Sequence, residues 1–146
     1  MDARAVCQVA GIEVGTLNVW VQRGLIPGMN VGARGRQRNF ALETATHILI
    51  MAELVRLGFG APAASNWARV CFYPYLLVSI TGRIDLSLER FRLLGFDSEA
   101  ELPQLLEKEF PEGRPNAYVV INAEGLRALM RQAHEEWERS HKGEGS

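Results

Sequence analysis

The chain has only two cysteines among its 146 residues, Cys7 and Cys71. They lie far apart, and neither belongs to a Cys-x-x-Cys motif or to a Cys/His spacing typical of a metal site. Isolated cysteines of this kind are typical of small buried hydrophobic side chains in a reducing compartment. We therefore expect no metal site and no redox site.

The sequence also has no long hydrophobic run. Its first residues, MDARAVCQVAG, contain no extended apolar segment of the kind found in signal peptides. The stretch YPYLLVSI is much too short to span a bilayer. We expect a cytoplasmic protein with no membrane partner.

No arrangement of residues typical of an enzyme is visible. His47, His134 and His141 have no mutual spacing suited to metal ligation, and the serines lack a nucleophile elbow. The segment GARGR lacks the Gly-Lys-Ser/Thr end of a phosphate-binding loop. We expect a protein that is not an enzyme and that needs no cofactor.

The net charge of −1 conceals an asymmetry along the chain. Residues 1–70 carry seven basic and four acidic residues, a net charge of +3. Residues 71–146 carry nine basic and thirteen acidic residues, a net charge of −4. This pattern predicts a first half that binds a polyanion and a second half with another task.

The first residues predict two short helices. Asp2 is placed to cap a helix over 3–10, and Gly11 is placed to end it. A second helix is predicted over 13–23, ended by Gly24. The helical period predicts these inward-facing side chains: Ile12, Leu17, Trp20 and Val21. Two helices joined by a Gly-centred turn fit helix-turn-helix geometry.

After a Pro-Gly stop, the helical period disappears over residues 29–40. Two glycines and the alternation in RQRNF predict a β-hairpin, or wing, in this segment. Helices are predicted over 42–57, with a wide apolar stripe, and over 62–69.

The second half has a different composition and predicts a small β-β-α-β-α module. Its predicted elements are strands over 75–80 and 84–88 (the second continuing at most toward Phe91), a helix over 99–110, a strand over 117–121 and a helix over 123–140. The sequence thus predicts an α+β protein with domains at 1–70 and 71–146.

Short motifs in the first half follow one another in a characteristic order. The residues that carry it are Gly11, Thr16, Leu17, Gly24, Leu25, Ile26, Pro27, Gly35, Arg36, Arg38, Phe40, Leu57, Gly58 and Phe59. Over roughly residues 3–70 the pattern resembles the MerR family of winged helix-turn-helix DNA-binding proteins. Glu13, Asn18 and Trp20 depart from that family's serine, arginine and tyrosine. The family's long dimerising coiled coil has no counterpart here.

The resemblance implies that the helix over 13–23 enters the major groove and that the wing contacts the backbone or minor groove. Amide side chains suit adenine, and an arginine suits guanine or a phosphate. Alternate arginines on a strand share one face and suit phosphates. The predicted DNA-binding residues are Thr16, Asn18, Val19, Gln22, Arg23, Arg34, Arg36 and Arg38.

The function that we predict is a sequence-specific DNA-binding transcriptional regulator acting on double-stranded DNA. One alternative is a phage-type architectural factor, such as an excisionase or a small terminase subunit. Another is a protein-interaction adaptor that does not bind DNA. The sequence indicates neither an operator, nor the sign of regulation, nor an effector.

We expect a homodimer, because operators are commonly read by two-fold dimers. Two surfaces in residues 71–146 are candidates, an edge of the small sheet and an apolar stripe on the last helix. The stripe consists of Leu126, Leu129, Met130, Ala133 and Trp137. The stripe has a second interpretation, in which it only covers the module's own strands. Residues 71–146 are alternatively a binding surface for another protein.

Overall fold

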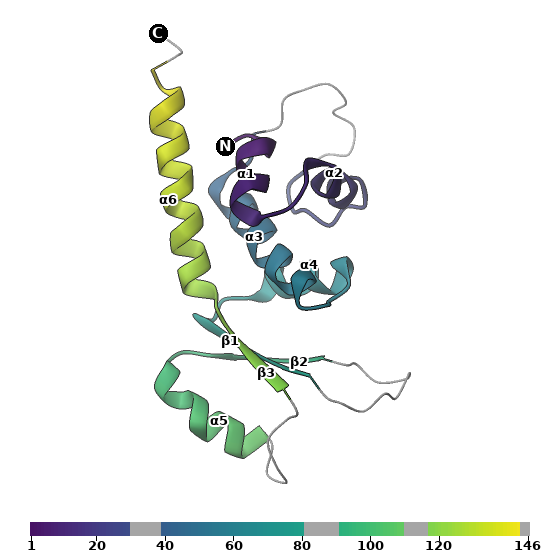
Figure 1. Ribbon diagram of the computed structural model, residues 1–146, viewed down its shortest axis with the longest axis vertical. Helices are drawn as coiled ribbons and strands as arrows, with labels where there is room; N and C mark the ends of the chain where they lie inside the picture. Colours follow the sequence, from purple (N-terminus) through teal and green to yellow (C-terminus); the bar gives the residue numbers. More distant parts are fainter. Residues whose placement is uncertain (30–38, 81–90, 110–116, 144–146) are drawn as a thin grey trace. The chain divides into compact units, whose positions relative to one another are not determined.

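The computed structural model describes residues 1–29, 39–80, 91–109 and 117–143. Over these residues the chain contains six α-helices and one three-stranded antiparallel sheet, which confirms a mixed α+β architecture (Figure 1). Its contacts divide it into two compact units, Met1–Val70 with Leu126–Ser146, and Cys71–Gly125. The sequence places one boundary near residue 70, where the structure also divides the chain. The sequence places the residues from Leu126 onward in the second domain, but in the structure they group with the first unit.

Two short helices begin the first unit. α1 spans Ala3–Ala10, and α2 spans Val14–Gln22. The Asp2 carboxylate accepts a hydrogen bond from the Ala5 N–H at 2.9 Å, and Gly11 ends α1 with a φ of 69°. A side-chain oxygen at the N-cap satisfies a donor that the helix leaves unpaired, and the left-handed conformation favours glycine. Both predicted bounds of α1 are therefore confirmed.

A longer helical pair completes most of the first unit. α3 spans Leu42–Arg56, α4 spans Ala61–Val70, and the two helices pack against each other. α3 supplies much of the core through Ala45, His47, Ile48, Leu49, Ile50, Met51, Ala52 and Leu54. Arg56 at its end donates a hydrogen bond to the Ala10 carbonyl at 2.8 Å. A cation at this position satisfies a carbonyl that α1 leaves unpaired, so it joins α3 to α1.

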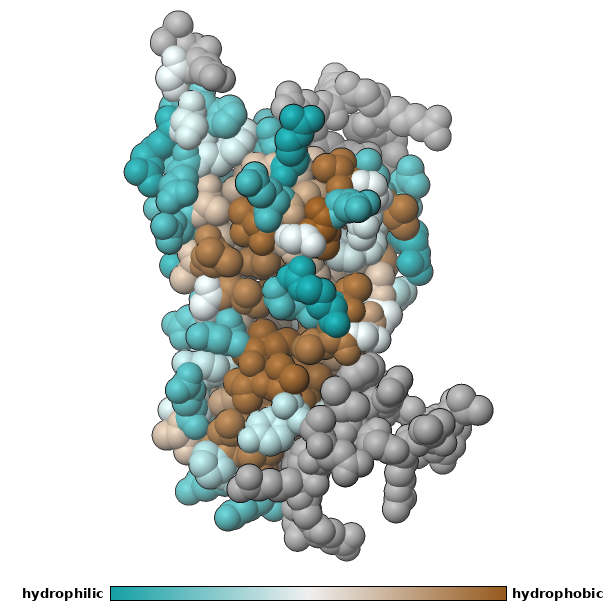
Figure 2. Space-filling view, in the orientation of Figure 1, coloured by the Kyte–Doolittle hydropathy of each residue, from teal (hydrophilic) through white to brown (hydrophobic). Residues whose placement is uncertain are grey.

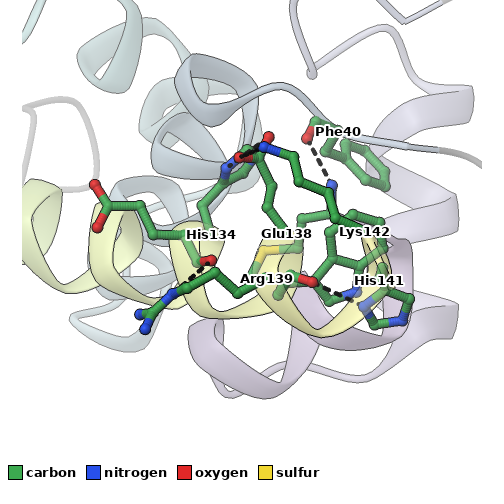
Figure 3. Close-up of polar contacts among 9 residues, drawn as sticks. Phe40, His134, Glu138, Arg139, His141 and Lys142 are labelled. Carbon is green, nitrogen blue, oxygen red and sulfur yellow. Dashed lines mark hydrogen bonds and ion pairs between the residues drawn. The ribbon is translucent and has the colours of Figure 1, made fainter. Parts of the chain in front are cut away.

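The first two residues pair with the segment that precedes α3. The Phe40 N–H donates to the Met1 carbonyl at 2.7 Å, and the Met1 ammonium donates to the Phe40 carbonyl at 3.3 Å (Figure 3). Asp2 and Asn39 form an isolated β-bridge beside these bonds. The predicted hairpin over 29–40 lies mostly outside the described residues, since 30–38 are not among them.

The second unit contains the sheet. Its strands are β1 (Tyr75–Ile80), β2 (Phe91–Phe96) and β3 (Ala117–Asn122), in the spatial order β2-β1-β3. β1 is antiparallel to both neighbours, and Leu77 lies opposite Leu94 and Val120. The predicted strands over 75–80 and 117–121 are confirmed. The predicted strand over 84–88 lies outside the described residues, and the described partner of β1 begins at Phe91.

One helix covers one face of this sheet. α5 spans Leu102–Glu109 and follows a 3-10 turn at Glu99–Glu101, so the predicted helix over 99–110 has a tighter start than expected. Leu106 of α5 is buried in one cluster with Leu77 and Phe96. Partly buried side chains surround this cluster, namely Tyr75, Leu94, Leu102, Leu105 and Val120.

The other face of the sheet is also apolar. Its buried side chains are Leu76, Val78, Leu93 and Ile121. Gly95 lies on this face, and a Cβ atom added there would lie only 2.0 Å from the Tyr73 ring. The ring therefore occupies the space that any other side chain at position 95 would need.

The last helix, α6, spans Ala123–His141 and confirms the prediction over 123–140. Its first residues belong to the second unit, and Leu126 onward belongs to the first. Asn122 caps α6, because its Oδ1 accepts a hydrogen bond from the Gly125 N–H at 2.8 Å. Met130 is fully buried. The part of α6 after Leu126 is therefore a component of the first unit, not a cover for the sheet alone.

Candidate nucleic-acid interface

The side chains of α2 divide into a buried set and an exposed set. Leu17, Trp20 and Val21 are buried, as the helical period predicts. The exposed set contains all five predicted contact residues of this region, namely Thr16, Asn18, Val19, Gln22 and Arg23. The helix is thus anchored by one side and presents the other to solvent.

The exposed residues of α2 form two neighbouring rows. Thr16, Val19 and Arg23 follow one another at three- and four-residue spacing, which places them on one face of a helix. Asn18 and Gln22 are four residues apart and form the adjacent row. Val19 is 49% exposed although it is apolar. This surface therefore offers amide groups, a hydroxyl, a guanidinium and one apolar group side by side.

The N-terminal end of α2 is less suited to an anion than its middle. Glu13 occupies the N-cap position, and its side chain makes no capping hydrogen bond. Its negative charge interacts favourably with the helix dipole but repels a phosphate. Any contact of this helix with DNA should therefore depend on residues from Thr16 onward.

The C-terminal end of α2 has a well-defined geometry. The Gly24 N–H donates to the Val21 carbonyl at 3.0 Å, and the Leu25 N–H donates to the Trp20 carbonyl at 3.0 Å. Gly24 has a φ of 71°. This pair of bonds with a left-handed glycine is a Schellman motif, which fixes how the chain leaves the helix. Gln22 and Arg23 lie directly before this turn.

Two side chains of α4 reach the carbonyls of the same turn. Ser65 Oγ donates to the Leu25 carbonyl, and Arg69 Nη2 donates to the Gly24 carbonyl at 3.5 Å. His47 of α3 lies behind them, with its Nε2 atom 3.3 Å from Ser65 Oγ. Burial lowers the pKa of His47 below its ordinary value of 6.5, the Leu25 carbonyl opposes this shift, and the charge of Arg69 adds to it. The sequence contained no local signal for these contacts, because they join residues far apart in the chain.

The arginines of the predicted wing, Arg34, Arg36 and Arg38, lie outside the described residues. The described residues on the C-terminal side of this segment are held firmly, since Asn39 and Phe40 pair with the first two residues of the chain.

The predicted dimerisation residues of α6 have unequal environments. Met130 is fully buried in its own chain, whereas Leu129 is 49% exposed. Leu126, Ala133 and Trp137 are partly buried, and the Trp137 ring stacks on the His141 ring with their centroids 4.1 Å apart. Much of the stripe therefore packs inside the first unit. The outer side of this helix is largely hydrophilic (Figure 2).

Polar contacts on α6 are mostly local. Glu138 forms an ion pair with Lys142 at 3.6 Å, and its carboxylate lies 3.9 Å from the His134 Nδ1 atom (Figure 3). Glu138 also affects the Met1 ammonium. Burial lowers the pKa of that ammonium, and the carboxylates of Asp2 and Glu138 oppose the shift.

Cys7 is a third described group whose pKa is shifted, besides His47 and the Met1 ammonium. Burial raises the pKa of the Cys7 thiol, which disfavours the nucleophilic thiolate. Within residues 1–29, 39–80, 91–109 and 117–143, no group of three or more His, Cys, Asp or Glu side chains is arranged to hold a metal ion. Among the same residues, no helix has the length and apolar character needed to cross a membrane.

The sequence was compared with protein-family models and with curated proteins. No protein-family model matches the chain, and no curated protein matches it significantly.

Proposed function

We propose that the protein is a sequence-specific DNA-binding regulator of the winged helix-turn-helix type, with α2 as its recognition helix. The observation that carries this proposal is the division of α2 into a buried side and an exposed side. An α-helix fits the major groove, where its outer side chains reach base edges. The motif order that resembles the MerR family supports the same assignment.

Each of the five predicted contact side chains at α2 has a suitable partner on DNA. The amides of Asn18 and Gln22 suit adenine, and Arg23 suits guanine or a phosphate. Thr16 and Val19 suit a thymine methyl group, and the Thr16 hydroxyl also suits a phosphate. Such mixed chemistry supports recognition of a particular sequence as well as general attraction.

The arginines at 34, 36 and 38 supply most of the expected backbone contacts. They account for three of the seven basic residues in residues 1–70, a region with only four acidic residues. Phosphate contacts position a protein on the duplex and make its affinity depend on salt. We assign these arginines to the phosphate backbone or a narrow minor groove.

We also propose that the protein acts as a homodimer. One winged-helix domain buries limited surface on DNA, and a palindromic site is bound by two DNA-binding domains, one on each half-site. Because Met130 is buried in its own chain, the contact should use an edge of the sheet or the exposed part of the α6 stripe around Leu129. Light scattering on the full chain at tens of micromolar tests this, and a monomer would exclude it. A 1–70 truncation is unsuitable, because it removes residues that belong to the first unit.

A binding selection on genomic fragments, read by sequencing, tests the function. Enrichment of a few promoter sites supports a regulator. Enrichment of one site beside integrase or packaging genes would instead support a phage-type architectural or packaging factor. The absence of enrichment even at low salt would contradict DNA binding and support a protein-interaction adaptor.

A further inference from the structure

The turn after α2 accepts hydrogen bonds from two side chains of α4, the helix that packs against α3. Ser65 and Arg69 are four residues apart on α4, so they lie on the same side of that helix. Ser65 donates to the Leu25 carbonyl, and Arg69 donates to the Gly24 carbonyl. Both acceptors belong to the two residues that follow Arg23. The turn after α2 is thus attached to α4 by side-chain hydrogen bonds.

The hydrogen bonds from Ser65 and Arg69 connect the turn after α2 to a helix other than the main packing partner of α2. Among the described helices, the closest packing partner of α2 is α1, whereas α4 packs against α3. The Schellman bonds fix the turn relative to α2 itself, but they do not fix it relative to the rest of the unit. The contacts from Ser65 and Arg69 supply that second constraint.

We propose that Ser65 and His47 are positioning residues for DNA recognition, which hold the C-terminal end of α2 so that Gln22 and Arg23 face the bases together. This inference rests on the proposed function. Ser65 is 1% exposed and His47 is 6% exposed, so neither is placed to touch DNA itself. They act through the Leu25 carbonyl.

The hydrogen-bond directions define which ring nitrogen of His47 carries a proton, and burial beside Arg69 decides against a second proton. Ser65 gives its proton to the Leu25 carbonyl, so its oxygen accepts from the Nε2–H of a neutral His47. A second proton would place a buried positive charge near the guanidinium of Arg69, the charged group that faces His47 from α4. The folded protein therefore favours neutral His47, and acidification should loosen the attachment.

The sign of the pH effect follows from the lowered pKa of His47. An unfolded chain protonates His47 as the pH falls below the ordinary value of 6.5, but the folded chain resists protonation. The contribution of this group is complete above that value and is lost as the pH falls toward the lower folded pKa. Acid should therefore lower the contribution of His47 to the stability of the folded chain.

Two variants of the full chain test the proposal. Ser65→Ala removes the donor to Leu25, and His47→Gln keeps an N–H donor but does not titrate. Ser140→Ala and His141→Gln are matched controls on α6, where both side chains are exposed and donate hydrogen bonds to local carbonyls, and where the His141 ring also stacks on Trp137. The first readout is amide hydrogen exchange of Gly24 and Leu25 without DNA. The second is affinity for a selected site relative to random DNA.

We expect Ser65→Ala to speed exchange at Gly24 and Leu25 about three- to tenfold and to lower selective affinity by a similar factor. Selective affinity of the wild type should be constant above about pH 6.5 and fall as the pH drops below that value, a range in which His47→Gln should stay constant. If Ser65→Ala unfolds, the pH comparison with His47→Gln decides the matter.

Unchanged exchange in Ser65→Ala, or equal pH dependence in wild type and His47→Gln, would overturn the positioning role. Faster exchange with no loss of selectivity would overturn it as well. A wild-type protein that binds no DNA contradicts the proposed function and with it any role in recognition. The exchange measurement then still decides whether Ser65 anchors the turn.

Discussion

The two compact units differ in architecture and in charge. The first, which includes Leu126–Ser146, is helical where the structure describes it and has eleven basic and eight acidic residues. The second, Cys71–Gly125, contains the sheet and has five basic and nine acidic residues. The net charges are +3 and −4, and the segment from Leu126 onward is neutral. The acidic excess therefore lies within Cys71–Gly125, and the contrast in net charge is the same as for a division at residue 70.

Under the proposed function, this difference corresponds to two tasks. An acidic surface repels phosphates, so we propose the first unit, not the second, as the one that binds DNA. We propose that the second unit contacts a protein, either another copy of the chain or a different partner. Substitutions that affect one unit and spare the other can test this separation.

The largest effect is expected from removing a buried leucine in each unit. Leu17→Ala should lower the free energy of unfolding of the first unit by about 2–5 kcal/mol, because it truncates one of the three buried side chains of α2. Binding to all DNA should fall with it. Leu77→Ala is the same change in the second unit, and it should destabilise the sheet but spare DNA binding. Hydrogen exchange and gel shifts measure both, and equal loss of DNA binding in the two variants would refute the separation of tasks.

The next effect is expected from the wing. Replacing Arg36 and Arg38 together with alanine should weaken binding to every sequence about ten- to hundredfold, since each charge-assisted contact contributes substantially. The log–log slope of affinity against salt should become shallower by roughly one unit for each lost phosphate contact. Replacing Arg83 and Arg114 of the second unit with alanine is the matched control, for which we expect no change. An unchanged slope in the folded wing variant would exclude the proposed role.

A smaller and more selective effect is expected from α2. Alanine at Asn18, Gln22 or Arg23 should cost about 1–3 kcal/mol on the selected site where the side chain contacts a base, and less on random DNA. Fluorescence anisotropy with both DNAs measures the difference. Base recognition by α2 would be contradicted if all three variants lost equal affinity for the two DNAs.

The smallest effect concerns the two glycines near the ends of α2. A Cβ atom at Gly15 meets nothing within 4 Å, so Gly15→Ala should stabilise the first unit by roughly 0.5–1 kcal/mol. Gly24 has a φ of 71°, so Gly24→Ala should destabilise the same unit by about 1–2 kcal/mol. Thermal unfolding measures both changes. If Gly15→Ala destabilised the protein, the result would contradict the placement of Gly15 at an open position on the surface of α2.

Much of the secondary structure could be predicted because its signals are local. Asp2 and Gly11 mark both ends of α1, and the period of Leu17, Trp20 and Val21 identifies the buried side of α2. The strand at Tyr75–Ile80 follows from a short apolar run between turn residues. In each case the residues that decide the structure lie within one or two turns of it.

The features that were not predicted depend on distant partners. The apolar stripe of α6 indicates that the helix packs, but not that Met130 packs into the first unit. Likewise, nothing near Ser65 in the sequence indicates a bond to Leu25, forty residues away. The assignments to Arg34, Arg36 and Arg38 stay predictions, because these residues lie outside the described part of the chain.

The division of α6 between the units has a consequence for synthesis. The second unit is one continuous stretch, so all of its residues have been made when Gly125 is added. The first unit is interrupted, because Met130 of its core is made only afterwards. Domains usually complete in the order of the chain, at about 5–20 residues per second. Here the order is different: the first unit becomes complete only after the second has been made, because its last segment follows Gly125 in the chain.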